Sequence, residues 1–234
     1  MNKIQIGAAL PVLGPLKFAL LALDYPFVLP SLWKYPHYRD AHIQLGKTWG
    51  IVDNDVHDKG IACSVDTIAT ILNDAPGWIG ILPDVIHKPV ATWNALIQTC
   101  LQTGISPKHW GIVLHGNDVE VMRFQFDLAH ELGFGLICFP YRALRHVYLH
   151  PDVLYFRGDQ RYHLMGLSER DSLITYGHLP GRWSIDTTKL YKADLTTKPW
   201  HGFTHQITDA FDLDLLKRNI DFLRKAFHGT SGAS

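Results

Sequence analysis

The sequence predicts an α/β fold, a single (β/α)8 TIM-like barrel that occupies residues 1–228. Two observations predict it. Short apolar runs recur along the 234 residues, and most are almost continuously apolar, as expected of parallel strands buried on both faces. Segments with helical periodicity separate several of these runs, which is the alternation that a barrel requires. An open doubly wound sheet is the alternative, because the first two runs are the least regular.

Each expected strand is one of these short apolar runs. The expected strands span residues 4–10, 18–23, 49–53, 78–83, 110–115, 134–139, 162–166 and 182–186. A polar segment follows the third of them, where Ser64 can open a short helix.

The remaining helices are expected where apolar residues recur at three- and four-residue spacing. One such stripe runs through residues 93–101 and another through residues 216–227. Between them, Asn117 or Asp118 can cap a helix, and Gly133 is suited to end it because glycine adopts the left-handed conformation without strain.

Composition favours one large core and excludes several classes of protein. Hydrophobic residues make up 47% of the chain, which is enough for a single domain of this length. The 22 basic and 22 acidic residues give a formal net charge of zero. A broadly basic nucleic-acid-binding surface is therefore excluded, whereas a local basic patch is not.

Cysteine spacing and hydropathy bear on the compartment. Cys63, Cys100 and Cys138 are far apart and form no paired-cysteine motif, which argues against a disulfide framework or a structural zinc site. No apolar stretch is long and unbroken enough to span a membrane. We therefore expect a cytoplasmic protein with no membrane partner, and a disordered tail at residues 229–234.

Three aspartates follow expected strands and are the main candidates for chemistry. Asp53, Asp84 and Asp186 lie at or just beyond the ends of apolar runs, where a barrel carries its catalytic side chains. A carboxylate at such a position can act as a nucleophile or as an acid/base. An aspartate that only closes a turn or caps a helix is the structural alternative for each.

Histidines near strand ends raise the possibility of a metal site. His87, His115 and His163 come from different segments, and their spacing matches no compact zinc pattern. We therefore expect no metal and no cofactor, although a metal-dependent barrel hydrolase stays an alternative. The chain also lacks a glycine-rich dinucleotide loop and a serine nucleophile elbow.

Six short segments occur in an order that is similar to one known family. They are Val-Asp-Asn-Asp-Val-His-Asp-Lys-Gly at 52–60, Leu-Pro-Asp-Val at 82–85, Gly-Ile-Val-Leu-His-Gly at 111–116, Phe-Pro-Tyr-Arg at 139–142, His-Leu-Met-Gly at 163–166 and Ser-Ile-Asp-Thr at 184–187. In this order they resemble the tRNA-guanine transglycosylase superfamily. They look closest to its compact, phage-type branch, which inserts 7-deazaguanine derivatives into DNA.

The resemblance implies a role for each aspartate. Asp186 would be the nucleophile that displaces guanine, Asp53 the general acid/base, and Asp84 the acceptor that recognises the purine. The mechanism would be that of a retaining glycosidase, with a covalent intermediate. Further substrate-binding residues would be Asn54, His115, Gly116, Phe139 and Tyr141.

The resemblance also implies partners, namely DNA and a free 7-deazaguanine base such as 7-cyano-7-deazaguanine, in the cytoplasm of a host cell if the protein is phage-encoded. The cysteine cluster of the tRNA enzymes is absent, which favours DNA over tRNA, the alternative partner. Cations expected at the same rim could bind phosphates. They are Lys59, Lys88, Arg142, Arg145, Lys189 and Lys192.

Three residues depart from the family pattern. Asp55 and Val56 replace small residues beside Asp53, and His115 replaces a glutamine. Asp55 and His115 favour a further alternative, a catalytically silent nucleic-acid-binding barrel.

Overall fold

Eight parallel strands form the centre of the molecule. The computed structural model describes residues 4–10, 16–56, 60–84, 89–115, 118–140, 154–166, 179–187, 190, 195 and 212–228. The strands are β1 (Gln5–Gly7), β2 (Phe27–Val28), β3 (Ile51–Val52), β4 (Ile79–Ile81), β5 (Trp110–Val113), β6 (Leu136–Pro140), β7 (Arg161–Met165) and β8 (Arg182–Asp186).

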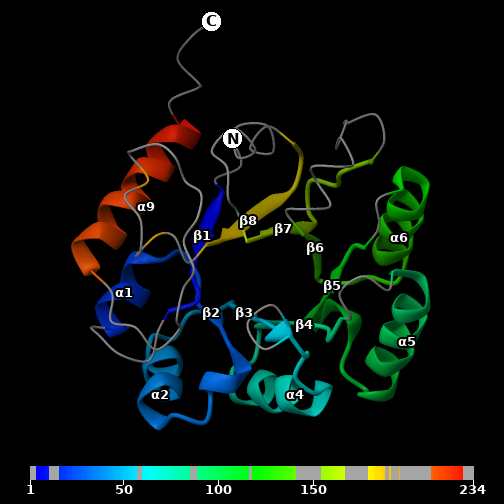
Figure 1. Ribbon diagram of the computed structural model, residues 1–234, viewed down its shortest axis with the longest axis horizontal. Helices are drawn as coiled ribbons and strands as arrows, with labels where there is room; N and C mark the ends of the chain where they lie inside the picture. Colours follow the sequence, from blue (N-terminus) through cyan, green and yellow to red (C-terminus); the bar gives the residue numbers. More distant parts are fainter. Residues whose placement is uncertain are drawn as a thin grey trace, which may run out of the picture.

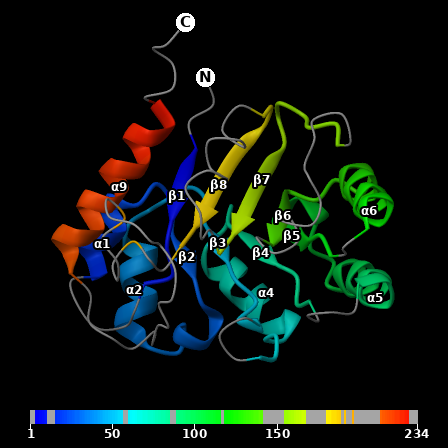
Figure 2. The same ribbon diagram turned by 45° about the horizontal axis from the view of Figure 1, so that its top comes forward.

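The strand order shows a barrel rather than an open sheet. Neighbours follow the order β1-β8-β7-β6-β5-β4-β3-β2, and every hydrogen-bonded pair is parallel. An isolated parallel bridge between Ala9 and Phe27 joins the two ends of this order. Figure 2 shows β1, β8 and β7 side by side, so that the first strand lies next to the last. The predicted (β/α)8 TIM-like barrel is confirmed.

In the view of Figure 1, the described helices flank the strands at the left, the bottom and the right. Those within the described residues are α1 (Leu16–Ala22), α2 (Pro36–Gln44), α4 (Val65–Asp74), α5 (Pro89–Gln102), α6 (Val119–Glu131) and α9 (Leu213–His228), with short 3-10 helices η1 (Pro30–Leu32) and η2 (Pro107–His109). None of these helices is long and apolar enough to cross a membrane.

Two predicted helix starts are confirmed by their caps. The Ser64 hydroxyl accepts a hydrogen bond from the amide of Thr67 at 3.2 Å, which begins α4. The Asp118 carboxylate accepts bonds from the amides of Glu120 and Val121 at 2.8 and 3.1 Å, which begins α6. Such caps pair amides that have no partner within the helix.

The expected strand at residues 18–23 was wrong, because this segment belongs to α1 and the second strand is β2. Phe18 and Leu21 are 63% and 62% exposed, whereas Ala19 and Leu20 are buried. This is helical periodicity with an apolar exposed face. A short apolar run cannot be assigned to strand or helix from hydrophobicity alone, which explains the error.

Side chains alternate between the barrel interior and the layer under the helices. On β6, β7 and β8 the outward residues Phe139, Tyr162 and Trp183 pack against one another, with ring centroids 4.9 to 6.2 Å apart. Phe126 of α6 stacks on Tyr162 at 6.0 Å. These aromatic contacts fix the three strands against the helical layer, and the opposite faces of β7 and β8 carry His163 and Ser184 inward.

One glycine lets two segments approach too closely for any side chain. A Cβ at Gly135 would overlap the carbonyl of Lys108, and the Gly135 amide donates to the carbonyls of Pro107 and Trp110. We expect Gly135→Ala to lower the free energy of unfolding by about 1–3 kcal/mol, as overpacking does. Gly158→Ala, where a Cβ meets open space, is the matched control in urea unfolding. Equal stability of the two variants would contradict the close approach.

His42 on α2 makes stability depend on pH. The ring is buried, its Nδ1 donates to the carbonyl of Tyr38 at 2.8 Å, and burial lowers its pKa to about 4. The unfolded chain regains a pKa of about 6.5. Between these values the unfolded state binds more protons, so stability present above pH 6.5 is lost as the pH falls towards 4.

We therefore expect the free energy of unfolding to fall by about 2 kcal/mol through His42 alone between about pH 7 and about pH 5. Urea unfolding of the wild type and of His42→Leu at both pH values measures this contribution. The variant should lose about 2 kcal/mol less than the wild type over the same interval. Parallel losses in the two proteins would show that His42 is not a buried neutral group.

Candidate active site

Three aspartates meet at the carboxyl end of the barrel. Asp53 directly follows β3, Asp186 is the last residue of β8, and Asp84 lies three residues beyond β4. Asp53 and Asp84 are 6% and 5% exposed, and the Asp186 side chain is 13% exposed. The parallel strands all end at the same side of the barrel, which is why residues distant in the sequence gather there.

The charges of all three carboxylates act on a buried thiol of β6. The pKa of Cys138 is raised well above its ordinary value, first by burial and then by the negative charges of Asp53, Asp84 and Asp186. Cys138 is fully buried and pairs in register with His163 of β7. The structure thus brings the three aspartates together around one inward-facing residue.

Asp186 is held by one of its two oxygens. Its Oδ1 accepts hydrogen bonds from the Gly166 amide at 3.0 Å and from Nε2 of His163 at 3.1 Å. The other imidazole nitrogen lies 3.0 Å from the Ser184 hydroxyl, and this hydroxyl donates a hydrogen bond to the carbonyl of Tyr162 at 3.2 Å. Among the described residues, none donates to Oδ2 of Asp186, so this oxygen is available for a ligand.

The His163 ring is fixed by the aromatic residues around it. It stacks on Phe27 with centroids 5.7 Å apart and meets the edge of Tyr25 at 6.4 Å. The Tyr25 hydroxyl donates to the carbonyl of Ile185 at 2.7 Å, and burial together with the charge of Asp186 raises its pKa. His163 is therefore a rigid support that sets the direction of the Asp186 carboxylate.

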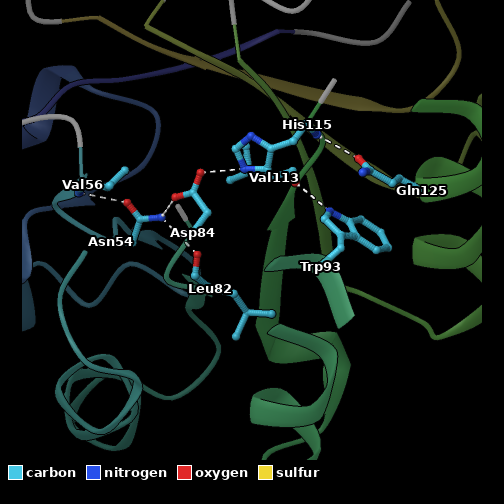
Figure 3. A network of polar contacts seen from close by, with 8 residues as sticks. All are labelled: Asn54, Val56, Leu82, Asp84, Trp93, Val113, His115 and Gln125. Carbon is cyan, nitrogen blue, oxygen red and sulfur yellow. Dashed lines mark hydrogen bonds and ion pairs between the residues drawn. The ribbon is translucent and has the colours of Figure 1, made fainter. Parts of the chain in front are cut away.

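Asn54 fixes the position of Asp84 (Figure 3). Its amide nitrogen donates to Oδ1 of Asp84 at 2.5 Å and to the carbonyl of Leu82 at 3.0 Å. Its amide oxygen accepts from the backbone of Val56 at 3.1 Å. Asn54 is fully buried, and these bonds use both of its donor hydrogens. The network links the segment after β3 to the segment after β4.

His115 contacts the second oxygen of Asp84. Nε2 of His115 lies 2.7 Å from Oδ2 of Asp84, as Figure 3 shows, at an angle unsuited to a hydrogen bond. The backbone amide of His115 donates to Gln125 of α6 at 2.8 Å. On the neighbouring helix, Trp93 donates to the carbonyl of Val113 at 3.0 Å. Both oxygens of Asp84 thus face polar groups, while α5 and α6 hold the end of β5.

Asp55 binds the backbone of the short helix η1. It adopts a positive φ of 61°, which is rare for residues other than glycine. Its Oδ2 accepts the Ser31 amide of η1 at 2.7 Å. Burial, followed by the charges of Asp55 and Asp53, raises the pKa of the Cys63 thiol to about 12. The departure at this position therefore adds a negative charge beside Asp53 that is anchored to η1.

One expected substrate-binding residue lies elsewhere. Phe139 is fully buried in the aromatic layer against Phe126 and Trp183, on the opposite face of β6 from Cys138. Phe139 therefore faces away from the aspartates, and the prediction that it contacts a substrate was wrong. Other predicted residues lie outside the described part of the chain. They are Lys59, His87, Lys88, Gly116, Tyr141, Arg142, Arg145, Lys189 and Lys192.

Sequence reasoning did not assign His163 and Ser184 to the site. A signal for both exists, because β7 and β8 carry polar side chains at alternate positions, with His163 at the centre of β7 and Ser184 at the centre of β8. A period of two places such residues on one face of the sheet. Gln125 left no comparable signal, since its position on α6 does not show which backbone amide it meets.

No group of three or more His, Cys, Asp or Glu side chains within the described part of the chain is arranged to hold a metal ion. The three cysteines are free thiols.

No family model matches the chain, and no curated protein is significantly similar to it.

The Asn54–Asp84 contact can be tested through stability. Asn54→Asp would place two carboxylates in contact and raise the pKa of the pair. The folded state would then bind more protons than the unfolded state, and stability would fall as the pH rises. We expect a loss of about 3 kcal/mol or more near pH 7, part of which is regained near pH 5.

Two controls separate this charge effect from the loss of hydrogen bonds. Asn54→Ala should cost about 1–3 kcal/mol, because it leaves buried polar groups without partners, and the cost should not depend on pH. Asn94→Asp introduces the same charge at an exposed position on α5 and should have little effect. Urea unfolding at both pH values measures all three variants. A pH-independent effect of Asn54→Asp would contradict the contact.

Proposed function

We propose that this protein is a pentosyltransferase that replaces guanine in DNA with a free 7-deazaguanine derivative such as 7-cyano-7-deazaguanine. The observation that carries the proposal is the convergence of Asp53, Asp84 and Asp186, with one oxygen of Asp186 held and the other available. The ordered sequence motifs, which resemble those of guanine transglycosylases, supply the reaction class.

In the first half-reaction, Oδ2 of Asp186 attacks the anomeric carbon of the nucleotide as the bond to guanine breaks. Asp53 donates a proton to the departing base, and a covalent aspartyl-glycosyl intermediate forms. Because His163 and the Gly166 amide hold Oδ1, the attacking oxygen needs little reorientation. Such pre-organisation lowers the entropic part of the barrier.

In the second half-reaction, Asp53 takes a proton from the incoming 7-deazaguanine base. The base nitrogen then attacks the anomeric carbon, and the bond to Asp186 breaks. The carboxylate and the acid/base group return to their starting states, so one pair of residues serves both steps. The reaction consumes no metal, oxidant or reductant.

Recognition of the base is assigned to the Asp84 network. The Asp84 carboxylate can accept hydrogen bonds from the exocyclic amine and a ring N–H of a guanine-like purine. Asn54 and His115 contact this carboxylate and hold it in place. A buried acceptor of this kind rejects a base that lacks the donors, because such a base would displace water from the carboxylate without replacing its hydrogen bonds. A base within a duplex must first be extruded, which costs a few kcal/mol.

The deciding experiment is base exchange. Guanine-containing DNA is incubated with the protein and 7-cyano-7-deazaguanine, and the digested nucleosides are analysed by mass spectrometry. We expect Asp186→Asn to reduce exchange by at least about 1,000-fold, because the nucleophile is lost while its hydrogen-bonding shape is kept. Asp53→Asn should reduce exchange by about 100- to 10,000-fold. Asp221→Asn, at an exposed position on α9, should retain full activity.

A second measurement tests the intermediate. Without free base, the wild type should form a protein–DNA adduct that survives denaturation, and Asp186→Asn should not. Exchange that survives in Asp186→Asn would contradict the assignment of Asp186 as the nucleophile. Exchange in tRNA but not in DNA would show that tRNA is the substrate. Tight DNA binding without adduct or exchange would indicate a catalytically silent binding protein.

A further inference from the structure

A cleft lies at the opposite end of the barrel from the aspartates. Its volume is about 420 Å³, which is within the range of small-molecule sites. The residues that line it precede or begin successive strands from β4 to β7. They are Gly77, Ile79, Lys108, His109, Gly135, Asp159, Gln160 and Arg161.

The cleft is lined by two cations, Lys108 and Arg161, that form no ion pair with a described carboxylate. The Arg161 guanidinium lies over the ring of Trp49 at 4.4 Å, a geometry that leaves its N–H edge able to bind a ligand. Arg182 pairs in register with Arg161 across β7 and β8. Burial and then the charge of Arg182 lower the pKa of Arg161. Among the described carboxylates, none forms an ion pair with Arg161, Arg182 or Lys108.

Backbone contacts fix the segments around the cleft. The Gly135 amide donates to the carbonyls of Pro107 and Trp110, and Gly77 adopts a φ of +94° that favours glycine. Gln160 donates to the carbonyls of Phe134 and Arg161 at 3.1 and 3.2 Å, which fixes the chain that leads into β7. The cations therefore lie beside a recess that is held open by fixed backbone.

We propose that this cleft binds a small phosphate monoester that also carries hydroxyl groups. The phosphate oxygens would pair with Arg161 and Lys108, a geometry that the planar guanidinium favours. Asp159 also lines the cleft and would repel a bare anion, whereas it accepts hydrogen bonds from hydroxyl groups on the rest of the ligand. This site is separate from the proposed exchange reaction and does not depend on it.

Calorimetric titration with ribose 5-phosphate, inorganic phosphate and ribose tests the proposal. We expect saturable binding of ribose 5-phosphate with a dissociation constant of about 1 mM or tighter. Inorganic phosphate should bind more weakly, and ribose should not bind. Arg161→Gln and Lys108→Gln should each weaken binding by about 10-fold or more, because each removes a charge-assisted hydrogen bond.

Matched variants show whether binding depends on this cleft rather than on any loss of charge, on the aspartates or on misfolding. Arg218→Gln removes an exposed charge on α9 and should bind as the wild type does, and so should Asp186→Asn. Lys108 is exposed, so its variant stays informative if Arg161→Gln fails to fold in circular dichroism. Three outcomes would overturn the proposal: no saturable binding of ribose 5-phosphate, equal binding of ribose, or binding unchanged in Lys108→Gln. Preferential binding of a dinucleotide that lacks a terminal phosphate would also overturn it, in favour of a nucleic-acid contact.

Discussion

Compensation of buried negative charge is the constraint on which the site depends. Asp53, Asp84 and Asp186 lie almost out of contact with solvent around Cys138, and an uncompensated buried carboxylate costs several kcal/mol. Asp186 accepts hydrogen bonds from an imidazole and a backbone amide, and Asp84 accepts one from the Asn54 amide and contacts the His115 ring. The residues that make these contacts come from other strands or loops, so the carboxylates couple the segments at the end of the barrel into one unit.

Strand register places the support for Asp186. His163 lies opposite both Cys138 and Ser184 in the parallel pairing, so all three side chains point inward at the same level. A shift by one residue would move His163 into the aromatic layer and bring Tyr162 inside. The outward aromatic contacts of Tyr162 and Trp183 resist such a shift. Packing on one face of the sheet thereby fixes the polar geometry on the other.

The sequence predicts the barrel and the convergence of the aspartates because both follow from apolar runs and strand ends. It fails at residues 18–23, where amphipathic character on a partly exposed helix resembles a strand. It also places Phe139 at the site, since position in the chain near a strand end does not show which face a side chain occupies. The partner of Asp55 could not be found either, because its bond to Ser31 depends on a positive φ and on a contact between separate loops.

Charge is separated along the barrel axis, with carboxylates at one end and Arg161 and Arg182 at the other. Arg161 and Met165 lie four residue steps apart along β7, or about 13 Å. At that separation two unit charges interact by only about 1 kcal/mol at an effective dielectric constant of about 20. The two ends therefore cannot neutralise one another, and each must find compensation locally or from a ligand. An electropositive, oxocarbenium-like transition state suits the acidic end, and by the same argument an anion suits the basic end.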